Sequence, residues 1–155
     1  MFRLLAKLAS SVLVPLVLVG VSSALALAVV PLKERATGTL TDVAPGSLTF
    51  AGEGNASHFG RFSEVGSANF DDVGNVSNGH FTTTTRDGAT ISGTFSGTYT
   101  PLPTGKIRFD LNVAYLSGTG RLAGVTGQAD VVAELDGVAP GAALEYEGIG
   151  SLVLP

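Results

Sequence analysis

The side chain best suited to proton chemistry in this sequence is His58, one of two histidines. Every second position of the stretch 47–62 belongs to one face, which places His58 with Leu48, Phe50 and Phe62. An imidazole inside a barrel or at its mouth could act as a general acid or base near neutral pH. A histidine near a strand bend can equally donate to a backbone carbonyl, and the sequence offers His58 no orienting partner. We therefore assign no catalytic residue and keep His58 as a weak candidate.

Carboxylates and metal ligands give weaker signals. Asp71 and Asp72 could contribute to a calcium site, but such a site needs about six to eight converging oxygens, and adjacent aspartates commonly shape a turn. Two histidines and no cysteine argue against a transition-metal site, so we expect neither a metal nor a cofactor. The remaining paired acids take outward positions two residues apart, as on a solvated face: Glu134, Asp136, Glu145 and Glu147.

Arg121 lies within a glycine-rich segment, 118–127 (GTGRLAGVTG). Such a turn could bind an anion through its backbone amides, or Arg121 could brace the turn by donating to carbonyl oxygens, which we favour. No helix or βαβ unit follows, so the segment is not a dinucleotide-binding loop. No Gly-x-Ser-x-Gly nucleophile motif occurs anywhere in the chain.

Alternating apolar and polar residues predict strands over most of the chain. The clearest is 106–115, in which Ile107, Phe109, Leu111, Val113 and Tyr115 share one face. We expect strands within 36–43, 47–62, 63–72, 79–85, 90–100, 106–115, 129–136 and 142–154, after a polar lead-in at 31–35. The stretch 47–62 is glycine-rich on its inner face, so we expect it to bend across hairpins or around a barrel corner.

This pattern predicts an all-β fold, an antiparallel barrel of about eight strands, with a jelly-roll-like sandwich as the alternative. A barrel of about eight strands has an interior just wide enough for side chains or for one small ligand. Glycines on the inner faces favour some unfilled space. The candidate ligand-binding residues are Phe50, His58, Phe62, Phe95, Tyr99, Phe109 and Tyr115.

Residues 1–28 have the pattern of a secretory signal helix. Arg3 and Lys7 precede an apolar stretch, and 24–26 and 26–28 both fit the small-x-small cleavage pattern. An uncleaved membrane anchor is the alternative. We therefore expect a single β-barrel domain over 29–155, located outside the cytoplasm as a secreted or periplasmic protein.

The charge of the expected mature chain argues against nucleic acid as a partner. Without Arg3 and Lys7 it carries seven basic and thirteen acidic side chains, a net charge of 7 − 13 = −6. Contact with a membrane is expected only through an uncleaved N-terminal segment. Homo-oligomer formation is open, as is use of the glycosylation sequons at Asn55 and Asn75.

Two motifs carry a resemblance to known proteins. The segments 52–62 (GEGNASHFGRF) and 118–127, with the closing Tyr146-Glu147-Gly148-x-Gly150, resemble a group of small secreted bacterial proteins of unknown function. The second motif is similar to the glycine-rich turn of the allene oxide cyclase and dirigent barrel superfamily. The resemblance implies an eight-stranded up-and-down barrel. No catalytic residue of those enzymes matches a position here, so it implies no activity.

Together these features predict an exported, non-catalytic barrel that binds a small apolar ligand or serves as a structural or interaction module. The alternative is an isomerase or cyclase that acts inside the barrel with His58 as acid and base. A cavity that encloses His58 beside a carboxylate would favour the enzyme, whereas an apolar cavity would favour ligand binding.

Overall fold

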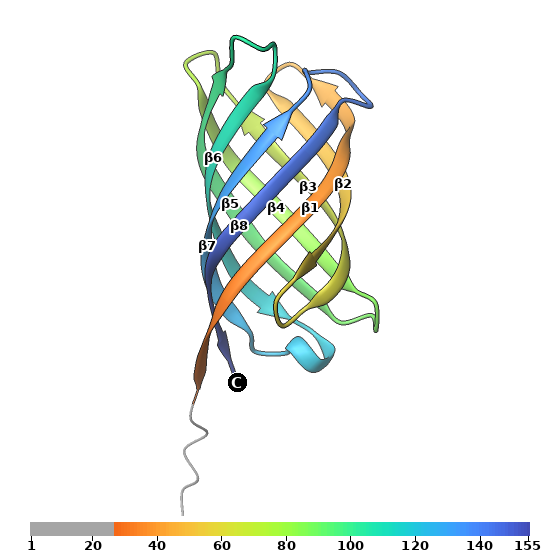
Figure 1. The fold of residues 1–155 in the computed structure, drawn as a ribbon, viewed down its shortest axis with the longest axis vertical. Coiled ribbons are helices and arrows are strands. Elements are labelled where there is room, and N and C mark those ends of the chain that lie inside the picture. Colours follow the sequence, from red (N-terminus) through yellow and green to blue (C-terminus); the bar gives the residue numbers. More distant parts are fainter. Residues whose placement is uncertain (1–26) are drawn as a thin grey trace, which may run out of the picture.

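The computed structural model describes residues 27–155, which form eight strands and one 3-10 helix, η1 (Gly120–Leu122) (Figure 1). Within these residues, no helix has the length and apolar character required to cross a membrane. The expected leader, residues 1–28, lies almost wholly outside the described residues. The strands are β1 (Ala28–Ala44), β2 (Ser47–Ala56), β3 (Gly60–Phe70), β4 (Asn75–Thr85), β5 (Thr90–Pro101), β6 (Ile107–Gly118), β7 (Thr126–Leu135) and β8 (Ala143–Leu154).

The strands close into one antiparallel barrel. Each strand pairs with its neighbours in the sequence, and β1 also pairs with β8, from Ala28 opposite Leu154 to Thr39 opposite Ala143. Since every strand has a partner on both sides, no sheet edge is left exposed. The prediction of an antiparallel barrel is confirmed, and the sandwich alternative is wrong.

Several predicted segment boundaries differ from the structure. The strand predicted at 79–85 begins at Asn75, and the one predicted at 129–136 runs over Thr126–Leu135. Residues 31–35 are not a lead-in but part of β1, which begins at Ala28. The stretch 47–62 is not one strand: it turns at 57–59, so that β2 and the start of β3 form a hairpin. Of the two alternatives that the glycine-rich inner face predicts, a hairpin and a barrel corner, the structure contains the hairpin.

Several inner glycines make room for aromatic rings. A methyl group added at Gly54 would lie 2.6 Å from the ring of Phe62, and methyl groups at Gly66 and Gly93 would meet the rings of Phe50 and Phe81. The glycines therefore leave less empty space than the sequence suggests, because large side chains from neighbouring strands fill it.

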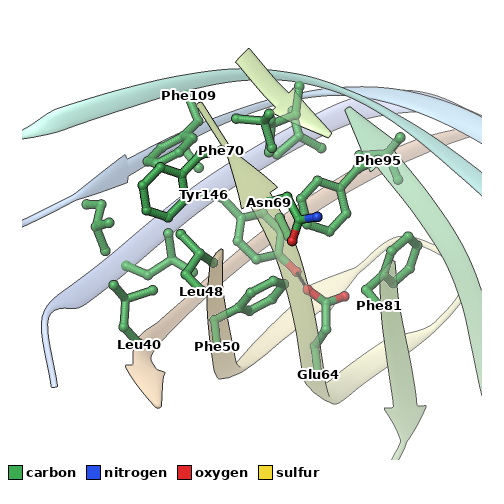
Figure 2. Close-up of a pocket in the computed structure, with 18 of the residues that line it drawn as sticks. Leu40, Leu48, Phe50, Glu64, Asn69, Phe70, Phe81, Phe95, Phe109 and Tyr146 are labelled. Atoms are coloured by element: carbon green, nitrogen blue, oxygen red, sulfur yellow. Dashed lines mark hydrogen bonds between the residues drawn. The ribbon is translucent and has the colours of Figure 1, made fainter. Parts of the chain in front are cut away.

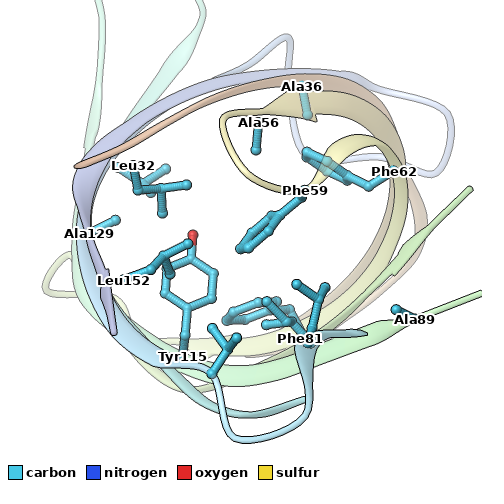
Figure 3. Close-up of a cluster of buried hydrophobic side chains, with 14 residues drawn as sticks. Leu32, Ala36, Ala56, Phe59, Phe62, Phe81, Ala89, Tyr115, Ala129 and Leu152 are labelled. Atoms are coloured by element: carbon cyan, nitrogen blue, oxygen red, sulfur yellow. The ribbon is translucent and has the colours of Figure 1, made fainter. Parts of the chain in front are cut away.

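The two ends of the barrel differ. The β2–β3 turn and η1 lie at the lower end in Figure 1, and Phe59 of this turn and Leu122 of η1 belong to one cluster of buried hydrophobic side chains that plugs this end of the barrel. Figure 3 shows Phe59 close to the ring of Tyr115, 6.1 Å away between ring centroids. Residues of this plug are at most 3% exposed: Leu32, Phe59, Ile91, Leu122, Val125 and Leu152. We call this the closed end.

Arg121 fastens the closed end. Its guanidinium donates to the carbonyl oxygens of His58 at 3.0 Å and Phe59 at 2.7 Å, and to Asp87 Oδ2 at 2.7 Å. Three separate turns are thereby tied to one side chain. The expectation that Arg121 braces carbonyl oxygens is confirmed, although the carbonyls belong to a neighbouring turn.

Candidate functional site

An apolar cavity of about 80 Å³ lies inside the barrel, between its middle and the upper end in Figure 1 (Figure 2). Its walls come from inward-facing positions of all eight strands, because the strand period of two sends alternate side chains inward. Aliphatic and aromatic side chains dominate these walls. They include Leu40, Leu48, Phe50, Phe70, Phe95, Phe109, Leu111, Val131, Ala133 and Leu144.

Two carboxyl groups interrupt this apolar lining. Glu34 lies on the inner face of β1 between Leu32 and Ala36, and Glu64 lies on the inner face of β3. Each is only 9% exposed, and both line the cavity. Carboxylates are almost never buried to this degree without a charged partner or a role.

Hydroxyl groups from three other strands donate to these carboxyls. Tyr115 Oη donates to Glu34 Oε1 at 2.7 Å, and Tyr146 Oη donates to Glu64 Oε1 at 2.9 Å. Thr83 Oγ1 donates to Glu64 Oε2 at 2.6 Å. Figure 2 shows the Tyr146 hydroxyl meeting Glu64 below the aromatic walls. The network joins β1, β3, β4, β6 and β8 across the barrel.

Burial controls the ionisation of both carboxyls. Desolvation, with a smaller repulsion from Glu64, raises the pKa of Glu34 to about 7, although the Tyr115 hydrogen bond opposes this rise. Desolvation likewise raises the pKa of Glu64 against the hydrogen bonds from Thr83 and Tyr146. Burial also raises the pKa of both tyrosines, so their hydroxyls remain donors.

One oxygen of this network is free to bind. Glu34 Oε2 has no hydrogen-bond partner in the described part of the chain. No fully buried side-chain nitrogen or oxygen in that part lacks a partner, so Oε2 must retain contact with open space. Because Glu34 lines the cavity, that space is the cavity itself.

The structure brings four of the seven candidate ligand-binding residues to the cavity: Phe50, Phe95, Phe109 and Tyr115. Phe62 packs instead in the core of the closed end. Tyr99 does not line the cavity: it packs against Phe70 and Phe109, and its hydroxyl donates to the carbonyl oxygen of Asp71.

His58 does not reach the cavity. The expectation that it shares the inner face with Phe50 is wrong, because the chain turns at 57–59 and His58 adopts a φ of 71° there. Its side chain is exposed at the closed end, where Nε2 lies 3.1 Å from the carbonyl oxygen of Pro31. This is the structural alternative considered for His58, a contact with a backbone carbonyl near a strand bend.

Glu34 and Glu64 are not among the site residues predicted from the sequence. Each interrupts a run of apolar or small residues at a spacing of two: Leu32, Glu34 and Ala36 in β1, and Phe62, Glu64 and Gly66 in β3. An acid on the apolar face of a strand is the signal that could have found them. Misplaced strand boundaries concealed it in both cases.

Comparison with known proteins finds no matching family model, curated protein or solved structure. The class of protein is therefore defined by its own geometry: a closed, eight-stranded antiparallel barrel with an internal apolar cavity and a buried pair of carboxyls. Among the described residues, no group of three or more acidic or histidine side chains is placed to hold a metal ion.

Proposed function

We propose that this protein is a non-catalytic binder of a small, largely apolar molecule held inside the barrel. The observation that carries the proposal is an apolar cavity sealed at one end by the Phe59 plug and bounded by the polar pair Glu34 and Glu64. Apolar walls with a few placed polar groups are typical of small-molecule sites.

The size of the cavity limits the ligand. A space of about 80 Å³ exceeds the roughly 10–15 Å³ that one water needs, yet it is far below the roughly 300–1,000 Å³ of sites for drug-sized molecules. The ligand is therefore a molecule of a few carbon atoms. A longer one would have to displace Phe70 and Phe109 from the walls.

We further propose that the protein acts outside the cytoplasm, with its leader removed near Ala26 or Ala28. The basic and apolar pattern of the first residues supports this proposal. The proposed relationship to small secreted bacterial proteins and to the allene oxide cyclase and dirigent superfamily rests on the glycine motifs and agrees with the barrel fold.

Xenon, a small neutral apolar probe, tests ligand binding by ¹²⁹Xe NMR. Ala133 and Val132 are neighbours on β7, but Ala133 lines the cavity and Val132 faces outward. We expect the wild type and Val132→Leu to bind the probe, and Ala133→Leu to lose binding because the added carbons fill the cavity. Circular dichroism confirms that both variants fold. Equal binding by Ala133→Leu, or no binding by the wild type, would contradict the proposal.

A second candidate function is proton-transfer catalysis on the bound molecule, as in an isomerase or cyclase. The observation that favours it is a cavity-facing carboxyl, Glu34, whose pKa burial raises to about 7, within the range of general acids and bases. Glu34 replaces His58 as the candidate group. Exchange of deuterium from D₂O into a bound carbonyl compound, abolished in Glu34→Gln, would support this function.

A further inference from the structure

We infer that the molecule held in the cavity is a small organic cation, a protonated amine on an apolar body, whose ammonium group lies against Glu34 and Glu64. This inference rests on the proposed function and specifies the chemical class of its ligand. It follows from charge balance, hydrogen bonding and the nature of the walls.

Charge balance is the first argument. The polar groups that face the two carboxyls are Tyr115 from β6, Tyr146 from β8 and Thr83 from β4, together with the opposite carboxyl. None is basic, and among the described residues no lysine, arginine or histidine lines the cavity. Two buried carboxyls without a cation must bind protons or a positively charged ligand.

Hydrogen bonding is the second argument. All three hydroxyls donate hydrogen bonds, and the carboxyl oxygens of Glu34 and Glu64 accept them. The unpartnered Oε2 of Glu34 adds acceptor capacity that faces the cavity. An ammonium group carries three N–H donors and no acceptor, which matches this unfilled capacity.

The walls provide the third argument. The rings of Phe50 and Phe95 line the cavity with centroids 6.2 Å apart in an edge-to-face arrangement, and Phe81 lies near Glu64 in Figure 2. Aromatic faces attract cations and also pack against an alkyl body. An anionic ligand would meet two carboxyls and no compensating charge, so the cavity selects against it.

Binding of such a cation must be coupled to pH. An ammonium group favours the ionised carboxyls, so it displaces protons from Glu34 and Glu64 when it binds. Affinity should therefore rise from about pH 5 and level off above the pKa of Glu34, which burial raises to about 7. A neutral ligand that accepts a hydrogen bond from a protonated carboxyl would show the opposite dependence.

Three probes of equal chain length, each short enough for the cavity, test the inference by calorimetry at pH 8: propylamine, 1-propanol and propanoate. We expect propylamine to bind about tenfold more tightly than 1-propanol, as a charge-assisted hydrogen bond would give, and propanoate to bind most weakly. Glu34→Gln should abolish the preference for the amine. The matched control is Glu145→Gln, at an exposed outer position of β8, which should behave as the wild type.

The outcomes separate this inference from the proposed function. If 1-propanol binds as tightly as propylamine, the inference of a cationic ligand is wrong and the proposed apolar binding site is retained; if no probe binds, the proposed function itself fails. Titration of propylamine into the wild type at pH 7, in buffers of different ionisation enthalpy, gives a second measurement that needs no variant. Proton release supports the inference, and its absence overturns it.

Discussion

At the scale of single residues, three hydroxyl groups oppose the effect of burial on the two carboxyls. Burial raises the pKa of Glu34 and of Glu64, whereas the hydrogen bond from Tyr115 lowers the pKa of Glu34 and those from Thr83 and Tyr146 lower the pKa of Glu64. The same tyrosines depend on the carboxyls as acceptors, because a buried phenol without a partner is costly. A change to either member of a tyrosine–glutamate pair should therefore also affect the other member.

Replacing Tyr115 by Phe separates burial from hydrogen bonding. The variant keeps the ring against Phe59 and Phe81 but removes the donor to Glu34 Oε1. We expect the pKa of Glu34 to rise above 7, because the lost hydrogen bond stabilises the ionised carboxylate. A ¹³C NMR titration of the glutamate carboxyls measures this change. The control is Tyr99→Phe, because the Tyr99 hydroxyl donates to the carbonyl oxygen of Asp71 and not to Glu34; it should leave the Glu34 titration unchanged. An equal shift in both variants would refute the role of the Tyr115 hydrogen bond.

Glu34 also makes the stability of the fold depend on pH. Its pKa is raised from 4.5 to about 7 by burial, so the folded state binds more protons than the unfolded state between these values. Its contribution is fully present below pH 4.5 and is lost as the pH rises to about 7, at a cost of about 3 kcal/mol. We expect Glu34→Gln to flatten this part of the pH profile and to be more stable than the wild type at pH 8.

Urea unfolding at pH 4.5, 6 and 8 measures the profile. Glu145→Gln is the control, because it removes the same charge from an exposed position. Glu64 has a raised pKa of the same origin and should keep a residual slope in Glu34→Gln. A wild-type slope that persists undiminished in Glu34→Gln would show that Glu34 ionises as freely in the barrel as in water.

At the scale of elements, Arg121 joins three turns at the closed end, and its removal should loosen the plug. Arg121→Ala leaves the carbonyl oxygens of His58 and Phe59 without their donor. We expect a loss of about 2 kcal/mol in the free energy of unfolding, reduced from the full value because the side chain is partly exposed. Denaturant unfolding measures it. Arg86→Ala is the control, since the Arg86 side chain makes no ion pair or hydrogen bond with the described residues, and it should cost little.

The elements were largely predictable, because their inner faces alternate. Ile107, Phe109 and Leu111 in β6, and Leu144 and Tyr146 in β8, point inward as their spacing predicts. The turn at 57–59 could not be located from spacing alone, since small residues on both sides of it preserve the alternation. Because this turn was not located, His58 was predicted to face inward, and Glu64 was assigned to a separate segment, 63–72.

At the scale of the whole molecule, the site is a product of closure. Glu34 and its donor Tyr115 are separated by 81 positions in the sequence, and Glu64 and Tyr146 by 82. No local sequence pattern can pair residues so far apart. The network could therefore not be predicted, even though the individual strands could. Closure through β1 and β8 brings Glu34 inside, which makes the first strand part of the site as well as of the wall.

We expect the segment 28–35 to be essential to the fold. It supplies the pairs from Ala28 opposite Leu154 to Arg35 opposite Glu147, and it carries Leu32, which is fully buried in the plug. Burying a leucine contributes about 1.5–3 kcal/mol, and the lost strand pairing would expose the edge of β8. Against a typical total stability of about 5–15 kcal/mol, we expect a chain that begins at residue 36 not to fold, whereas one that begins at residue 27 keeps every strand pair. Circular dichroism with urea unfolding compares the two chains. A cooperative transition of equal midpoint in both would mean that the barrel does not need its first strand to close.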